Sequence, residues 1–128
     1  MEELLFEVGH PNYKLLCDIG NFVCADEDFA TACGRLFPMA AHVHAKDMFC
    51  RSGDRYAPGE GWIELRSGNY VRPTVLGHGD VPVYQILRAL KKSGYDGFVS
   101  IEFEGMEDNL DALRISADNL KRMLADIE

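Results

Sequence analysis

The sequence has few of the features that mark membrane, secreted or nucleic-acid-binding proteins. Apolar runs such as residues 4–6 are far too short to cross a bilayer, and no long apolar stretch of a secretory signal follows the acidic N-terminus. Basic residues are scarce and scattered: 13 Lys and Arg stand against 21 Asp and Glu, a net charge of −8. Because such a chain repels phosphate backbones, we expect a soluble cytoplasmic protein without nucleic-acid or membrane partners.

The cysteines also exclude two common kinds of small domain. The chain has four cysteines but no C-x-x-C pair, so neither a disulfide framework nor a zinc cluster is predicted. We interpret them as reduced thiols that are partly buried as small apolar residues. With 47% apolar and 27% charged residues, residues 1–128 have an ordinary globular balance and form a single unit without an internal boundary.

Short apolar segments alternate with amphipathic ones along the chain. Residues 14–17, 40–45 and 98–101 are bounded by turn residues and predict buried strands of a parallel sheet. Helical patterns cover residues 29–37 and 83–90. The apolar stripe of a last helix consists of Leu110, Leu113, Ala117, Leu120, Leu124 and Ile127. This alternation predicts an α/β architecture with parallel strands and right-handed crossovers.

One segment departs from the alternation. Residues 48–80 contain six glycines and two prolines, and we expect them to form a long irregular loop that lies over the carboxyl ends of the strands. A structureless loop of this length in a compact domain is usually functional.

Polar side chains stand where the predicted strands end. Asp18, His44 and Glu102 each lie at the end of an apolar segment, the edge at which α/β sheets bind ligands. Each residue alone has another explanation: Asp18 as a turn or helix-cap residue, His44 as a hydrogen-bonded core histidine, Glu102 as the partner of a lysine. Together they favour a divalent cation, which stabilises clustered carboxylates and binds imidazole nitrogen.

These residues belong to five short elements that occur in a fixed order. The elements are Asp18-x-x-Asn21, His42-Val-His-Ala-Lys-Asp47, Gly77-His-Gly-Asp80, Gly94-Tyr-Asp-Gly97 and Ile101-Glu-Phe-Glu104. Over residues 11–124 this order resembles the sugar phosphate isomerase/epimerase family of xylose-isomerase-like TIM barrels. The resemblance implies that the chain is the C-terminal portion, about the last three β/α units, of a (β/α)8 TIM barrel with parallel strands.

The resemblance also implies a divalent metal ion (Mn, Co, Zn or Mg) held by a glutamate, an aspartate, a histidine and a second glutamate. Asp18, His44 and Glu102 correspond to the last three ligands. His42 and Glu104 lie two residues away on the same strand faces and are the fallback ligands. The first glutamate would lie on the strand before Asp18 and has no counterpart in this chain.

The implied activity is isomerisation or epimerisation of a sugar or sugar phosphate by metal-assisted proton transfer through an enediolate. Glu102 is the expected catalytic acid–base group. Lys46 and His78 are expected near the substrate, although a surface loop position explains His78 equally well. Since one metal ligand is missing, we expect little or no isomerase activity from this chain alone.

The glycine-rich segment supplies further candidates for binding the sugar or its phosphate. Arg66 and Arg72 are the main ones, and Arg51, Arg55 and Trp62 accompany them. The alternative is a solvated loop whose arginines pair with the surplus acids of the chain.

Two other functions remain open. One is a non-catalytic interaction or regulatory half-barrel without a complete metal site. The other is a phosphodiester-cleaving enzyme of the apurinic-site repair type. The charge of −8 and the lack of the histidines of a three-metal cluster disfavour the latter. A complete barrel needs about 250 residues. We therefore expect a part of a longer protein, or a chain that covers its open sheet edges as a homo-oligomer or by association with the missing N-terminal half.

Overall fold

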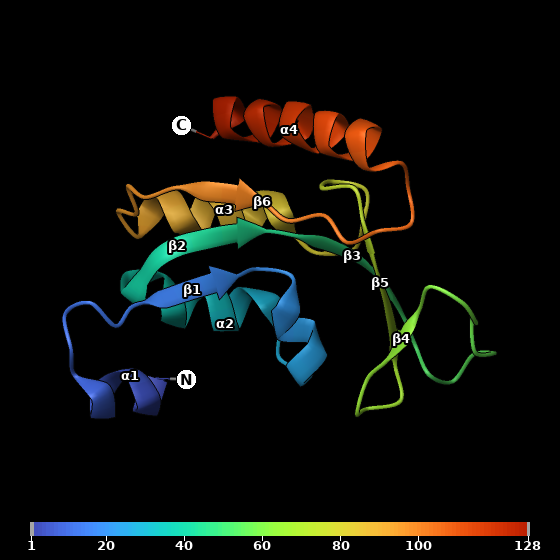
Figure 1. Cartoon of the computed structure of the whole chain (residues 1–128), viewed down its shortest axis with the longest axis horizontal. Helices are drawn as coiled ribbons and strands as arrows, with labels where there is room; N and C mark the ends of the chain where they lie inside the picture. Colours follow the sequence, from blue (N-terminus) through green and yellow to red (C-terminus); the bar gives the residue numbers. More distant parts are fainter. Residues whose placement is uncertain (1, 128) are drawn as a thin grey trace.

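The computed structural model describes residues 2–127, which fold around a parallel sheet (Figure 1). Strands β1 (Leu15–Asp18), β2 (Ala40–Ala45) and β6 (Val99–Ile101) pair in parallel in the order β1-β2-β6. The helices are α1 (Glu2–Val8), α2 (Phe29–Leu36), α3 (Val83–Lys92) and α4 (Asn109–Asp126), with short 3-10 turns η1 (Asn21–Ala25) and η2 (Phe37–Met39). The predicted α/β class and the order of these strands and helices are confirmed.

The two faces of the parallel sheet differ in what they carry. Helices α2 and α3 lie behind the sheet in Figure 1, on the side where Cys17 and Val43 are buried. Alternation along β1 and β2 places Leu16, His42 and His44 on the opposite face. Leu16 is half exposed there, while the two histidines are partly buried. The face of the sheet opposite α2 and α3 is therefore partly polar.

Helix α3 buries the side that its periodicity predicts. Val83, Ile86, Leu87 and Leu90 are all buried, and Gly94 follows the helix with a φ of +78°. A positive φ is easily adopted by glycine and ends a helix.

Helix α4 buries only part of the predicted stripe, namely Leu120, with Ile127 buried just after the helix. Leu110, Leu113 and Leu124 of the expected stripe are 80%, 42% and 45% exposed. The buried residues are Ala112, Ser116, Asn119 and Leu120. Two of them, Ser116 and Asn119, hydrogen bond to the backbone of the turn before α3, at 3.0 and 2.7 Å. Polar anchors thus fix how α4 packs, and its apolar stripe is left partly in solvent.

The prediction of an irregular loop over residues 48–80 is wrong. This segment contains most of a second, antiparallel sheet of β3 (Asp47–Arg51), β4 (Ile63–Glu64) and β5 (Tyr70–Thr74), in the order β3-β5-β4. Strand β3 follows β2 after the single residue Lys46, and the sheet extends beyond the carboxyl ends of the parallel strands (Figure 1). The glycines mostly occupy turns, and Pro73 pairs with Met48 beyond the end of β4, where β5 has one neighbour only.

Two further observations concern the cysteines and the helices. All four cysteines are free, and Cys17 and Cys33 are buried. Among the described residues, none of the helices has the length and apolar character needed to cross a membrane.

The exposed leucines of α4 and the outer strands β1 and β6 predict self-association of this chain. Replacing Leu110 and Leu113 together with Gln should raise the monomer fraction, measured by sedimentation velocity at several concentrations. The matched change Lys121→Gln, at an exposed position of α4, should leave the distribution unchanged. A wild-type chain that stays monomeric at every concentration contradicts the prediction.

Candidate metal centre

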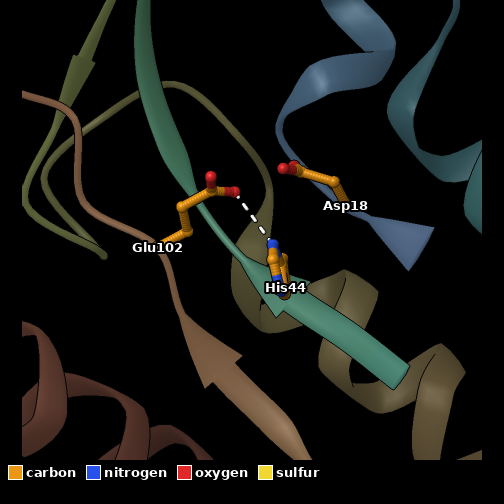
Figure 2. A group of neighbouring side chains, drawn as sticks. All are labelled: Asp18, His44 and Glu102. Atoms are coloured by element: carbon orange, nitrogen blue, oxygen red, sulfur yellow. Dashed lines mark hydrogen bonds and ion pairs between the residues drawn. The ribbon is translucent and has the colours of Figure 1, made fainter. Parts of the chain in front are cut away.

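Three neighbouring strand ends bring three potential metal ligands together. The register pairs Asp18 with His44, and the Glu102 amide continues the β2–β6 pairing by donating to the Ala45 carbonyl at 3.1 Å. The three side chains approach one another in Figure 2, each from a different strand end. One potential ligand atom from each of Asp18, His44 and Glu102 lies within 4.8 Å of the others.

Within this cluster His44 and Glu102 are in direct contact. His44 Nδ1 lies 2.9 Å from Glu102 Oε2. Two atoms bound to one ion at about 2.1 Å are themselves roughly 3.0–3.4 Å apart in octahedral or tetrahedral geometry. The pair therefore has nearly the separation of two ligands on one ion.

Asp18 is held in place by the turn that follows β1. Its Oδ1 accepts hydrogen bonds from the amides of Gly20 and Asn21 at 2.9 and 3.0 Å, and its Oδ2 accepts from Asn21 Nδ2 at 2.9 Å. Asp18 is thus a turn residue, as one interpretation of the sequence proposed, and it also faces His44 and Glu102. The turn fixes the direction of its carboxylate.

Lys46 supplies the positive charge of this cluster. Its side chain is only 3% exposed, and its Nζ lies 3.9 Å from Asp18 Oδ2 and 3.6 Å from Glu102 Oε2. It also forms a hydrogen-bonded ion pair with Glu104. Burial lowers the pKa of Lys46, but Glu104 and the two other carboxylates outweigh that effect and leave the pKa raised. Lys46 is therefore a buried ammonium group among three acids.

The pKa values of the two carboxylates, Asp18 and Glu102, are shifted in opposite directions. Burial raises the pKa of Asp18, as does its approach to Glu102, although the amides of Asn21 and Gly20 and the charge of Lys46 oppose this. The interaction with Asp18 lowers the pKa of Glu102, and His44 and Lys46 act in the same direction against a smaller effect of burial. When two carboxylates lie close together, the more buried one holds a proton more readily, so its pKa rises while the pKa of the other falls.

The fallback ligands have other partners. His42 Nε2 lies 2.8 Å from Ser100 Oγ, and its ring packs edge-on against His44 with 5.5 Å between centroids. Glu104 is exposed and bonds to Lys46. Among residues 2–127, the potential metal-binding group contains neither of them.

Asp47 is the important residue that the sequence reasoning missed. It is 1% exposed, and its carboxylate accepts hydrogen bonds from four backbone amides. The donors are Met48 at 2.8 Å, Gly77 at 2.8 Å, Gly79 at 2.9 Å and Val81 at 3.2 Å. Burial raises the pKa of Asp47, and these amides oppose the shift. The Gly-His-Gly-Asp element is therefore a turn wrapped around a buried carboxylate.

His78 lies in this turn and is exposed, with its amide bonded to the Val75 carbonyl at 2.9 Å. Of the predicted sugar-binding arginines, Arg66 is exposed and makes no hydrogen bond, ion pair or ring contact with the residues that the structure describes. Arg72 lies instead against the rings of Phe49 and Trp62.

The family of the chain follows from a comparison with known proteins. Residues 1–123 match the family model described as Xylose isomerase-like TIM barrel. The chain belongs to this family. No curated protein matches the sequence significantly.

Solved structures of xylose isomerase-like TIM barrels have the same fold. The chain superposes on 98% of its length with a xylose isomerase domain protein from Planctomyces limnophilus, at a TM-score of 0.73 and 22% identity, covering 41% of that chain. A magnesium complex from Mycobacterium smegmatis gives a TM-score of 0.74 at 22% identity, with 98% of this chain and 39% of that one covered. A protein from Alicyclobacillus acidocaldarius subsp. acidocaldarius gives 0.65 at 24% identity, with 97% and 41% covered. The chain thus spans about two fifths of the length of these barrels.

The turn around Asp47 leaves no room for a side chain at Gly79. A Cβ atom there would overlap the Asp47 carboxylate and lie 2.6 Å from the Met48 carbonyl oxygen. We expect Gly79→Ala to lower the free energy of unfolding by about 1–3 kcal/mol, measured by urea denaturation.

A matched substitution should act in the opposite direction. Gly34 lies within α2, and a Cβ atom added to it would have no neighbouring atom within 4 Å, so Gly34→Ala should stabilise the chain by about 1 kcal/mol. Equal effects of the two substitutions would contradict the role given to the Asp47 turn.

Proposed function

We propose that this chain carries most of the metal site of a sugar or sugar phosphate isomerase/epimerase. The observation that carries the proposal is the convergence of Asp18, His44 and Glu102 at the carboxyl ends of three parallel strands. Active sites of TIM barrels lie at this edge. Membership of the xylose isomerase-like family and the magnesium named for the M. smegmatis structure support the same conclusion.

The donor set fits a divalent ion. Two carboxylates and one imidazole suit Mn, Co, Zn or Mg, and Asp18, His44 and Glu102 would hold the ion. When bound, it would supply a Lewis acid for the oxygens of the sugar. No described residue occupies the place of the family's first glutamate, so we expect little turnover from this chain alone.

The chain's own residues then have distinct tasks. Glu102, whose lowered pKa keeps it ionised, removes or returns a proton at the carbon beside the carbonyl. Asn21 holds the Asp18 carboxylate in its orientation. Lys46 presents its ammonium group between Asp18 and Glu102, where it can donate a hydrogen bond to a substrate oxygen.

A second function, a non-catalytic half-barrel, is favoured by one specific observation. The ammonium group of Lys46 already lies within 4 Å of both carboxylates of the cluster, so it neutralises part of their charge without any metal ion. The two functions differ in whether the purified chain binds a divalent ion at this cluster.

Metal titration decides between them. We expect the chain to bind one Mn²⁺ per molecule in calorimetry, and Asp18→Ala or His44→Ala to weaken binding by at least about tenfold, because even residues that merely orient ligands contribute 10–100-fold. The matched changes Asp26→Ala and His10→Ala, at exposed positions outside the cluster, should have no effect. A folded chain that binds no divalent ion supports the half-barrel instead.

Lys46 gives a second prediction. Because its ammonium group competes with a metal ion for Asp18 and Glu102, Lys46→Met should tighten Mn²⁺ binding and lower the stability of the metal-free chain, since buried carboxylates lose their counter-charge. Adding Mn²⁺ should then raise the Tm of Lys46→Met more than that of the wild type. Lys14→Met, at an exposed position, is the control. An unchanged Mn²⁺ affinity in Lys46→Met contradicts the competition.

A further inference from the structure

The antiparallel sheet carries a second pocket that shares no residue with the metal centre. It encloses about 450 Å³, within the range of small-molecule sites. Three arginines and the single tryptophan of the chain line it, namely Arg51, Arg55, Arg72 and Trp62.

The arginines are arranged around the tryptophan. The guanidinium carbon of Arg51 lies 4.7 Å from the centre of the Trp62 ring, and that of Arg72 lies 5.6 Å from it. Arg72 also lies 5.1 Å from the ring centre of Phe49. Cation–π contacts of this kind hold two like-charged groups close to the same indole. Trp62 therefore positions two guanidinium groups beside one cavity.

The sequence left open that these arginines pair with surplus acids. Arg51 and Arg55 have no acidic partner of this kind among the described residues, and Arg72 interacts only with the charge of Glu107. Among residues 2–127, Arg51, Arg55 and Arg72 form no ion pair, whereas Arg114 pairs with Asp111 and Arg35 pairs with Glu2. Three unpaired arginines are unexpected in a chain with a net charge of −8, where acids are in excess. Their grouping creates a local positive field in an acidic protein.

The acids near the pocket accept hydrogen bonds from groups other than the three arginines. Asp80 is the acid among the described lining residues, and its Oδ2 accepts the Cys50 amide at 2.7 Å. Glu107 accepts a hydrogen bond from Thr74 Oγ1 at 2.6 Å. Burial raises the pKa of Glu107, but Thr74 and the charge of Arg72 lower it overall. Arg72 Nε and Glu107 Oε2 are both buried without a hydrogen-bond partner among the described residues, so Glu107 does not satisfy the Arg72 donor.

We infer that this pocket binds the phosphate group of a phosphomonoester. Three guanidinium groups and one carboxylate line it, and Glu107 offsets part of the charge of Arg72 from outside the lining. The pocket therefore stays net positive, which favours an anion with several oxygens. Guanidinium groups bind phosphate oxygens in pairs through planar, charge-assisted hydrogen bonds. The phosphate belongs either to the sugar at the metal centre or to a separate phosphorylated ligand.

The fluorescence of Trp62 reports this pocket directly, because the chain has no other tryptophan. The full chain is titrated in EDTA, at constant ionic strength set with sodium chloride, with inorganic phosphate, a hexose 6-phosphate or the unphosphorylated hexose. We expect saturable fluorescence changes with both phosphates and none with the hexose. Because EDTA removes divalent ions, the absence of phosphate binding in this titration would leave the proposed metal binding untouched.

Arginine variants test the residues. Arg72→Gln and Arg51→Gln should each weaken phosphate binding by roughly tenfold or more. Folding of both variants is checked by circular dichroism. Because Arg51 is exposed, Arg51→Gln tests the pocket even if Arg72→Gln impairs folding. Arg88→Gln removes the same charge from an arginine that stacks on Tyr84 outside the pocket and should leave binding unchanged.

Two results would overturn the inference: no saturable signal with either phosphate, or equal weakening by Arg88→Gln, which indicates unspecific attraction. The source of the phosphate follows from adding Mn²⁺. Tighter binding of hexose 6-phosphate with Mn²⁺ that is lost in Asp18→Ala supports a substrate phosphate, and unchanged binding supports a separate ligand of the same pocket.

Discussion

The buried carboxylate of Asp47 is the interaction on which the arrangement of this molecule depends. It lies where β2 passes into β3, and it binds the amides of the turn that leads from β5 into α3. One side chain thus joins the parallel sheet, the antiparallel sheet and the start of a helix. A buried charge without such donors would be strongly destabilising, so the turn must close around it. Lys46, the residue before it, is directed to the metal centre and is positioned by the same strand.

The sequence was most informative where geometry follows from topology alone. The carboxyl ends of parallel strands meet at one edge, so Asp18, His44 and Glu102 could be placed together without knowledge of any contact. The choice between His44 and His42, or between Glu102 and Glu104, needed knowledge of side-chain contacts. The two residues of each pair lie on the same strand face, two positions apart. His42 is bound by Ser100 and Glu104 by Lys46, and both partners are far along the chain from the residues that they bind.

Other features depended on partners that a periodic pattern does not identify. The stripe of α4 located the helix and its buried Leu120. It did not show that Ser116 and Asn119 also face inward, where they hydrogen bond to the backbone before α3. The glycines of residues 48–80 indicated turns, yet strands as short as β4 leave almost no pattern between turns. The buried role of Asp47 was hidden for the same reason, since its donors lie about thirty residues away along the chain.

The candidate metal centre and the arginine pocket lie at the two ends of one short stretch of chain, because β3 follows β2 after the single residue Lys46. Lys46 stands beside the metal centre and Arg51 beside the pocket, five residues apart, which is roughly 17 Å between Cα atoms at about 3.3 Å per residue. Phe49 also lines the pocket and lies three residues from Lys46, roughly 10 Å at the same rise per residue, so the near side of the pocket is closer to the cluster than Arg51 is. Because the hydrogen bonds of Asp47 fix the chain directly after Lys46, the separation depends on the backbone of β3. If one sugar phosphate contacts both sites, as the two proposals together imply, it binds in an extended form with its phosphate at the end opposite the reacting carbon.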